Sequence, residues 1–184
     1  MDLGVKTLAT FSNGETVVGS KPMKMLLVRL KRLSRSLSRK KKGSANWHKA
    51  KSKIAKLHAR ISNIRKDTLH QLTSDLTRRF ETICIEDLNV SGMLKNRKLS
   101  RHIADMGFYD FRRQLDYKSS KMRGNQVVIA DRFFPSSKTC SACGTVKQDL
   151  TLKDRVFECQ CGYKQDRDLN AAINLANYAV SYTV

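Results

Sequence analysis

Two stretches of the chain repeat apolar residues at alternating intervals of three and four. The first contains Leu26, Leu30, Leu33 and Leu37, and the second contains Ile54, Leu57, Ile61, Ile64, Leu72, Leu76 and Phe80. A single apolar stripe at this spacing is typical of an amphipathic helix. The run K-K-K-G-S-A-N interrupts the pattern between them. We therefore predict an antiparallel helical hairpin within residues 21–80, whose second helix starts near Asn46.

The first twenty residues have a different pattern. Asn13-Gly14 separates two β-prone stretches, and this dipeptide is the strongest short-range signal for a β-hairpin, because both turn positions need positive φ. We predict that residues 7–12 and 15–19 pair as antiparallel strands. Asp2 precedes them in D-L-G, a position like the exit from an earlier strand of which only Met1 is present.

Two short apolar runs, residues 82–85 and 126–131, predict buried strands, and each run is followed by or ends in an acid. Cys84 lies in the first run and is expected to be a buried small hydrophobe. Between the two runs, six positions outline one further helix: Leu99, Ile103, Met106, Phe111, Leu115 and Met122. Helical spacing returns in the last helix at Leu169, Ala172, Ile173, Ala176 and Ala179 or Val180. The order of elements predicts a mixed α/β fold.

The charge of the chain predicts a polyanionic partner. The chain has 184 residues, a formal net charge of +20 and 40% hydrophobic residues, so it can bury a core and is not a disordered basic tail. Residues 21–66 contain seventeen Lys or Arg and neither Asp nor Glu. A solvated face usually mixes both signs, so we interpret this segment as a phosphate-contacting surface. Nucleic acid is the favoured partner, and an anionic membrane surface is the alternative.

The membrane alternative is limited to surface binding. No apolar run approaches the roughly 20 residues that span a bilayer, and residues 1–20 lack the pattern of a secretory signal. We therefore expect a cytoplasmic protein. Trp47 lies in the basic segment, where a place in the helical seam is favoured over stacking on a base.

Four cysteines near the C-terminus have the spacing of metal ligands. Cys140 and Cys143 form a C-x-x-C pair, fifteen residues follow, and Cys159 and Cys161 form a C-x-C pair. A glycine follows each pair and permits the tight turn that aims two sulfurs at one ion. We predict one structural Zn²⁺ site; the alternative, two disulfides, fits an intracellular chain poorly. Four cysteine ligands leave no open position on the ion, so catalysis must lie elsewhere.

Three acids stand at comparable places in the predicted fold: Asp2 in D-L-G, Glu86 after a buried strand, and Asp168 at the start of the last helix. Taken singly, Glu86 fits a turn and Asp168 fits a helix cap. Together they suit a two-metal phosphodiesterase, in which several carboxylates hold two Mg²⁺ or Mn²⁺ ions roughly 4 Å apart.

Four ordered motifs resemble the C-terminal part of the TnpB/OrfB proteins of insertion sequences, long labelled transposases: M-D-L-G-V-K-T-L-A-T-F-S-N-G-E, I-E-D-L-N-V-S-G-M, F-P-S-S-K-T-C-S-A-C-G and C-G-Y-K-Q-D-R-D-L-N-A-A-I-N-L. The resemblance covers essentially the whole chain. It implies an RNase H-like, RuvC-type sheet lacking its first strand, with a long basic helical hairpin insertion and an inserted zinc ribbon. Family members act as RNA-guided DNA endonucleases.

By motif, the resemblance implies that Asp2, Glu86 and Asp168 are catalytic, with Asp166 as a substitute for the third acid. It also implies that Cys140, Cys143, Cys159 and Cys161 hold Zn²⁺, with C-x-C as the departure from the family pattern. Mg²⁺ or Mn²⁺ would be the catalytic ion, and DNA and guide RNA the partners, through residues 21–66.

The expected organisation is a nuclease core over residues 1–137, a zinc ribbon over 138–165 and a closing helix over 166–184. The segment 132–139 contains bases, hydroxyls and aromatics that could grip a single strand or pack the zinc module against the sheet. Two alternative functions remain. One is a truncated, inactive, zinc-stabilised fragment that binds nucleic acid, and the other is a basic zinc-ribbon RNA-binding protein whose acids lie scattered.

Overall fold

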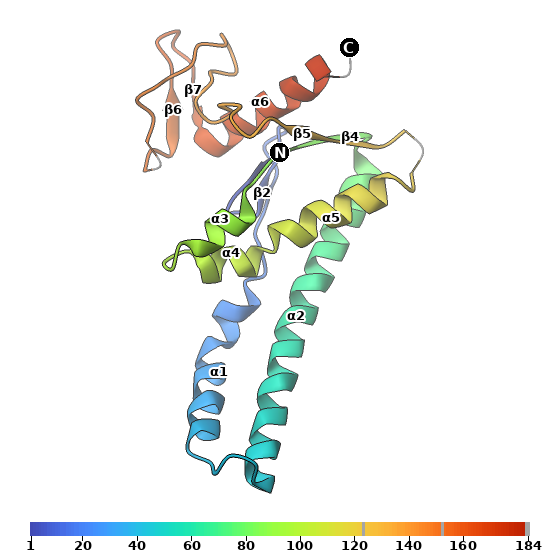
Figure 1. Ribbon diagram of the computed structural model, residues 1–184. Coiled ribbons are helices and arrows are strands. Elements are labelled where there is room, and N and C mark those ends of the chain that lie inside the picture. The colour runs from blue at the N-terminus through green and yellow to red at the C-terminus, as the bar shows by residue number, and fades with distance from the viewer. Residues whose placement is uncertain (123, 152, 183–184) are drawn as a thin grey trace.

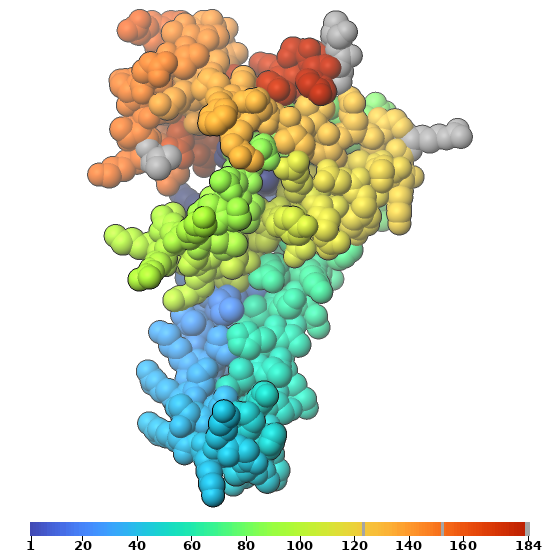
Figure 2. Space-filling view, in the orientation of Figure 1, coloured from blue at the N-terminus to red at the C-terminus, as the bar shows by residue number. Residues whose placement is uncertain are grey.

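A computed structural model of the chain describes residues 1–122, 124–151 and 153–182. A long helical hairpin extends from a broader body that contains the strands and the remaining helices (Figure 1). The space-filling view shows the same division, with the hairpin as a narrow projection (Figure 2). Within the described ranges, no helix combines the length and apolarity needed to cross a bilayer.

The elements follow the order β1–β2–β3–α1–α2–β4–α3–α4–α5–β5–β6–β7–α6. The strands are β1 (Asp2–Leu3), β2 (Ala9–Thr10), β3 (Thr16–Val17), β4 (Thr82–Glu86), β5 (Gln126–Ala130), β6 (Val156–Glu158) and β7 (Lys164–Asp166). The helices are α1 (Pro22–Ser38), α2 (Ala45–Arg79), α3 (Val90–Lys95), α4 (Ser100–Met106), α5 (Phe108–Ser119) and α6 (Arg167–Tyr182). Within the described ranges α6 reaches Tyr182, and the last two residues of the predicted closing helix, 183–184, lie outside these ranges.

Helices α1 and α2 form the predicted hairpin. They pack side by side, and the leucine stripe of α1 is partly buried while Leu57 and Ile61 of α2 are fully buried. Ser44 caps α2 by accepting a hydrogen bond from the Trp47 backbone N–H at 3.2 Å, which places the helix start one residue before the predicted Asn46. The long α2 continues past α1 and packs against α5, so it joins the projection to the body.

The predicted N-terminal β-hairpin is confirmed, but its turn differs from the prediction. Strands β2 and β3 pair antiparallel, with Thr10 opposite Thr16. The Phe11 N–H donates to the Glu15 carbonyl, which leaves a three-residue loop, and within that loop only Gly14 has positive φ, at 88°. This is the three-residue type of hairpin loop, in which a single glycine supplies the left-handed conformation.

Strands β4 and β5 form a parallel pair with Thr82 opposite Gln126 and Glu86 opposite Ala130. Their side chains alternate between two apolar clusters. Ile83 and Ile85 face the cluster that includes Phe111 of α5, whereas Cys84 faces Leu175 of α6. Both predicted strands and the buried position of Cys84 are therefore confirmed, and the pair lies between α5 on one side and α6 on the other (Figure 1).

Strand β1 joins the two parts of the sheet region. It pairs antiparallel with β2 and contacts β4, and the Met1 ammonium donates to the Cys84 carbonyl at 2.7 Å. The sequence interpretation placed Asp2 beyond a strand, whereas Asp2 is the first residue of β1.

The single helix predicted from Leu99 to Met122 is two helices. Gly107 ends α4 and begins α5 with φ at 69°, a conformation that breaks an α-helix. A Cβ at this position would lie 3.0 Å from Arg65 Cδ and Leu69 Cδ1 of α2, so the close approach of α2 also favours glycine. Met122 lies beyond α5 and is 39% exposed, so its assignment to the apolar stripe was wrong.

Candidate carboxylate site and cysteine cluster

Three acids from distant parts of the chain line one cavity. Asp2 begins β1, Glu86 ends β4, and Asp168 lies in the first turn of α6. The cavity has a volume of about 320 Å³ and is also lined by Lys6, Arg155 and Arg167, among other residues. The structure thus brings together the three acids that the sequence singled out. The scattered arrangement expected of a zinc-ribbon protein without a nuclease site is not observed.

The acids interact electrostatically. Burial, followed by the negative charges of Glu86 and Asp168, raises the pKa of the Asp2 carboxyl to about 7. The buried Met1 ammonium and Arg167 act in the opposite direction. Arg167 Nη2 lies 3.2 Å from Asp168 Oδ1 and compensates part of the charge. Like charges held at this proximity are a favourable environment for a divalent cation, which would replace the proton on Asp2.

Ser136 fixes the second acid. Its hydroxyl donates a hydrogen bond of 2.6 Å to Glu86 Oε1, and Ser136 is itself buried. Glu86 is therefore held both by the end of β4 and by the loop that follows β5. The sequence interpretation assigned Ser136 only to a segment of mixed polar and aromatic residues, because nothing local shows that it reaches a residue 50 positions away.

Asp166 and Asp168 have different roles in the structure. Asp166 Oδ1 accepts hydrogen bonds from the backbone N–H groups of Asp168 and Leu169, at 2.9 and 3.1 Å, which is the geometry of a helix cap. Asp168 instead faces the cavity shared with Asp2 and Glu86. The capping role considered for Asp168 thus belongs to Asp166.

Two buried asparagines of α6 attach the loop that precedes the cysteines. Asn174 Nδ2 donates to the carbonyls of Ser136 and Thr139, at 2.7 and 2.6 Å, and Asn170 Nδ2 donates to Thr139 at 2.7 Å. Asn170 Oδ1 also accepts from the Ser141 N–H. Sequence reasoning missed both residues. Their spacing of four puts them on one helix face, and that would have been the signal.

The buried face of α6 matches the predicted stripe only at Ala172 and Ala179. It consists of Asn170, Ala171, Ala172, Asn174, Leu175 and Ala179. Val180 is 65% exposed, and Leu169, Ile173 and Ala176 are only partly buried. The polar anchors therefore share their face with the small apolar residues that pack on β4 and β5.

The four cysteines are free thiols whose sulfur atoms all lie within 4.8 Å of one another. Cys140 Sγ lies 3.8 Å from Cys161 Sγ, and Cys143 Sγ lies 3.6 Å from Cys159 Sγ. Tetrahedral coordination with Zn–S bonds of about 2.3 Å requires sulfur separations of about 3.8 Å. The donor set and spacing therefore fit a metal ion such as zinc.

The turns around the cysteines also match the prediction. Gly144 and Gly162 have φ of 76° and 90°, so the residue after each cysteine pair adopts the left-handed conformation. Strands β6 and β7 pair antiparallel and present the second pair of cysteines. Hydrogen bonding between Cys143 and the side chain and backbone of Thr145 lowers the pKa of the Cys143 thiol to about 6, so this thiol loses its proton more readily than an ordinary cysteine.

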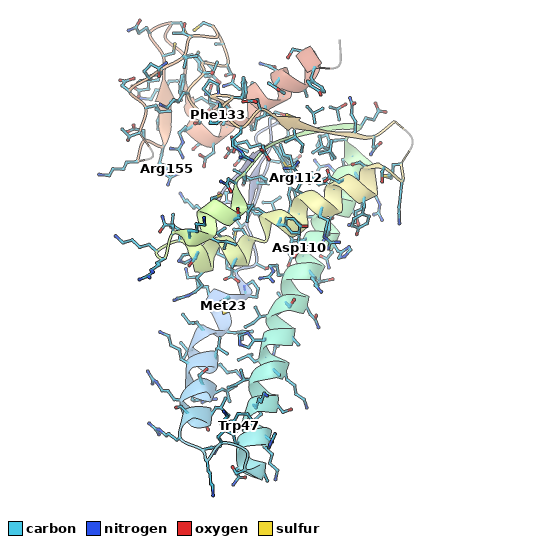
Figure 3. All side chains as sticks on the ribbon, in the orientation of Figure 1. Met23, Trp47, Asp110, Arg112, Phe133 and Arg155 are labelled. Carbon is cyan, nitrogen blue, oxygen red and sulfur yellow. The ribbon has the colours of Figure 1, made fainter. Side chains whose placement is uncertain are left out.

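Basic residues gather in two further places. Asp87 accepts hydrogen bonds from Arg112 and Arg132, and these guanidinium groups lower its pKa. Figure 3 shows Arg112 between α5 and the strands, and Phe133 and Arg155 on the upper body.

In the segment 132–139, Phe134 packs on Tyr178 with ring centroids 4.9 Å apart, whereas Phe133 is 86% exposed. One aromatic therefore packs the loop, and the other faces solvent.

The second basic region is a cleft between α1 and α2. Its volume is about 420 Å³, and five cations line it with Leu33 and Leu57: Arg29, Arg32, Lys53, Lys56 and Arg60. Trp47 lies at the far end of the hairpin, half-buried, with the Lys51 ammonium 5.1 Å from its ring centroid (Figure 3). It stands apart from both apolar clusters of the body.

Comparison with solved structures defines the fold. A chain in a cryo-EM structure of a Cas12f1–sgRNA–target DNA complex matches 96% of this chain and 48% of its own length, with a TM-score of 0.63 and 18% identity. This protein is thus a mixed α/β protein that shares the fold of the matched part of that chain. Three of its carboxylates line one cavity, and its four clustered cysteines could hold zinc.

Sequence comparisons are more specific. The profile of the OrfB_IS605 family, described as a probable transposase, matches residues 1–97, and that of the Cas12f1-like TNB domain matches residues 108–175. A Streptomyces pristinaespiralis protein named "Putative RNA-guided DNA endonuclease" is 45% identical over 95% of this chain. InsQ of Escherichia coli (strain K12), which bears the same descriptive name, is 39% identical over 98%. The chain therefore belongs to the OrfB_IS605 family, as its motifs predicted. It spans 43% and 49% of the length of these two curated relatives.

Proposed function

We propose that this chain carries the nuclease site of a TnpB-type, RNA-guided DNA endonuclease, in which Asp2, Glu86 and Asp168 hold two Mg²⁺ or Mn²⁺ ions for phosphodiester hydrolysis. The observation that carries the proposal is the meeting of these three acids at one cavity. Family membership and the names of the relatives support DNA as the substrate. The arrangement of β1 beside β4, with β5 parallel to β4, supports an RNase H-like, RuvC-type core.

The chemistry divides between bound ions and the residues of the chain. Two such ions would activate the attacking water and stabilise the leaving 3′ oxygen. The chain's own residues position the substrate: Lys6, Arg155 and Arg167 line the acid cavity and can bind the phosphates on either side of the scissile bond. Ser136 keeps the Glu86 carboxylate in one orientation through its hydrogen bond to Oε1.

We assign Zn²⁺ to Cys140, Cys143, Cys159 and Cys161 as a structural ion, because four thiolates fill its coordination shell. Thiolates prefer Zn²⁺ and carboxylates prefer Mg²⁺ or Mn²⁺, so the two sites would select different ions. The partners we propose for residues 21–66 are DNA and guide RNA. The cleft lined by Arg29, Arg32, Lys53, Lys56 and Arg60 supports this assignment, since a phosphate backbone matches its charge.

A nicking assay tests the nuclease proposal. The chain is incubated with single-stranded DNA and Mg²⁺ or Mn²⁺, and cleavage is expected to disappear in Glu86→Ala and Asp168→Ala while the zinc content stays unchanged. Glu81→Ala is the matched control, because Glu81 is exposed and precedes β4 at the end opposite Glu86. Cleavage that persists in both acid variants would overturn the proposal.

One observation favours a second function, an inactive zinc-stabilised domain that binds nucleic acid. Asp2 is held in a strand of two residues, so few backbone hydrogen bonds fix the first acid within the tolerance that catalysis demands. This alternative predicts salt-sensitive binding of single-stranded DNA with no cleavage in either metal ion. The nicking assay and a binding titration on the same preparation therefore separate the two functions.

A further inference from the structure

A second cavity adjoins the acid cavity and differs from it in chemistry. It has a volume of about 390 Å³, within the roughly 300 to 1,000 Å³ typical of ligand pockets. Leu3 and Glu86 line both cavities, so the two share a wall. Leu88, Val90 and Phe108 give the second cavity apolar walls, where the acid cavity is mostly charged. An occupant of the second cavity would therefore lie next to the carboxylates without needing to contact them.

An aromatic ring lines the open side of this cavity. Tyr109 is the second residue of α5. It lines the cavity, yet it is 68% exposed. The neighbouring Phe108 is 2% exposed and belongs to the core. The core therefore accounts for Phe108 but not for Tyr109, whose ring is available to a flat ligand. Every nucleobase offers a π-face to such a ring.

Two guanidinium groups line the polar side of the cavity. Arg112 comes from α5 and Arg132 from the loop after β5, and each donates to a different oxygen of Asp87. Asp87 thereby positions two cations against one anion and leaves a net positive charge. Planar guanidinium groups can bind phosphate or stack on a base. Figure 3 shows Arg112 on the strand-facing side of α5.

We propose that this cavity binds a nucleobase of the single strand whose phosphates enter the acid cavity, with Tyr109 as the stacking face and Arg112 and Arg132 at its polar edge. The inference rests on the proposed nuclease function and adds to it a site that positions the strand. Asp87 acts as a positioning residue, since it holds the two guanidinium groups.

The test compares two ligands of equal charge. Fluorescence anisotropy measures the affinity for two oligonucleotides with the same number of phosphates, an eight-nucleotide oligothymidine and an eight-nucleotide abasic strand, in buffer without Mg²⁺. The quantity compared is the ratio of the two affinities. The wild-type chain is expected to bind the thymidine ligand about 10-fold more tightly, because base stacking on an aromatic side chain adds to the phosphate contacts. Tyr109→Ala is expected to bring this ratio close to one without changing the abasic affinity. Tyr109→Phe is expected to retain the ratio.

Tyr182→Ala is the matched control, because Tyr182 is also an exposed tyrosine, at 70%, and lies on α6. A wild-type ratio near one would overturn the proposal. So would a ratio that survives Tyr109→Ala, or one that is lost only in Phe133→Ala. Cleavage by the wild-type chain is scored separately. A wild-type chain that shows the ratio but does not nick DNA contradicts the nuclease proposal alone, and a wild-type chain that nicks DNA but shows no ratio contradicts the base pocket alone.

Discussion

At the residue scale, the aspartates in and around the acid site have different roles. Asp168 faces the carboxylate cavity, Asp166 caps α6, and Asp87 holds two arginines beside Glu86. Each role follows from where the backbone places the side chain and not from the acid itself. Asp2 is the most perturbed of the acids, because burial and two neighbouring carboxylates disfavour its charge.

This perturbation predicts a pH-dependent stability for the chain without Mg²⁺ or Mn²⁺. The pKa of Asp2 rises from 3.8 to about 7 on folding, so the folded state keeps a proton that the unfolded chain releases. The free energy of unfolding should therefore fall as pH rises from about 4 to about 7. Relative to wild type, Asp2→Asn should gain roughly 1 to 3 kcal/mol between pH 5 and pH 8, measured by urea unfolding.

The charges that act on this carboxyl are those of Glu86, Asp168, Arg167 and the Met1 ammonium. Lys6 and Arg155 line the same cavity. Adding Mg²⁺ at pH 8 should reduce the advantage of the variant, since the ion would stabilise the charged wild-type site. If the difference in unfolding free energy between Asp2→Asn and wild type is the same at pH 5 and pH 8, the pKa of Asp2 does not change on folding and the prediction is wrong.

The residues of the site divide into those that local sequence shows and those that only tertiary contact reveals. The three acids and four cysteines stand in short motifs, so their identity could be predicted. Ser136 could not be predicted, and the spacing of Asn170 and Asn174 shows only that they share a helix face, because the partners of all three residues lie 29 to 50 positions away. Asp87 was missed for the same reason, since its arginines come from α5 and from the loop after β5.

At the element scale, the apolar pattern predicted the helical hairpin and the two buried strands. It did not show that these strands pair in parallel. It failed at Gly107, where one apolar pattern continues through two helices. The break lies where α2 comes close, and a Cβ at Gly107 would be only 3.0 Å from side-chain atoms of Arg65 and Leu69. The apolar pattern also could not show what anchors α1, because the carboxylate that accepts hydrogen bonds from its first turn belongs to Asp105 of α4.

The break at Gly107 gives a prediction with a matched control. Gly107→Ala and Gly43→Ala both place alanine at positive φ, 69° and 83°, but only at Gly107 does the new Cβ meet other atoms, at 3.0 Å. Gly43→Ala should cost about 1 kcal/mol from backbone strain alone. Gly107→Ala should cost roughly 1 to 3 kcal/mol more, because α2 or α5 must shift. Equal losses in chemical unfolding would show that the contact with α2 is readily relieved.

Asp105 anchors the basic hairpin to the body. This buried carboxylate accepts hydrogen bonds from the backbone N–H groups of Met23 and Lys24, at 2.8 and 3.0 Å, in the first turn of α1. Asp105→Ala should reduce stability by about 1 to 3 kcal/mol, because it leaves two helix N–H groups without this partner. Hydrogen exchange should accelerate most in α1.

Asp110→Ala serves as the comparison for Asp105→Ala. Asp110 lies in the first turn of α5 and forms a 3.4 Å ion pair with Arg113 near the surface, so its loss should cost less than about 1 kcal/mol. Uniform acceleration of exchange in α1 and α5 of Asp105→Ala would contradict a local anchoring role.

At the scale of the whole molecule, the cysteine cluster and the carboxylate site are connected through the loop 136–141. Cys140 belongs to this loop, Asn170 and Asn174 of α6 bind its backbone, and Ser136 at its start holds Glu86. The cationic hairpin shares none of these contacts and projects from the other side of the body (Figure 1). Loss of the proposed Zn²⁺ should therefore affect the acids but not the α1–α2 surface.

Cys161→Ser tests this division. Loss of a thiolate should abolish stoichiometric Zn²⁺ binding, measured by metal analysis, and should release β6 and β7, because four-cysteine sites draw folding free energy from the ion. We expect faster hydrogen exchange in β6, β7 and residues 136–141 and a loss of nicking. Single-stranded DNA binding through the hairpin should persist with its salt dependence unchanged, because the cations of α1 and α2 remain in place.

Cys84→Ala provides the control, because Cys84 is the fifth cysteine, is buried between β4 and α6, and lies outside the cluster. It should keep one Zn²⁺ per chain and normal exchange in residues 136–141, even if removing the sulfur lowers overall stability. Two results would contradict the connection: Cys161→Ser that nicks DNA at the wild-type rate, or Cys161→Ser whose DNA affinity falls as far as its nicking. The first would mean that α6 alone holds the acids, and the second that the hairpin also depends on the cysteine cluster.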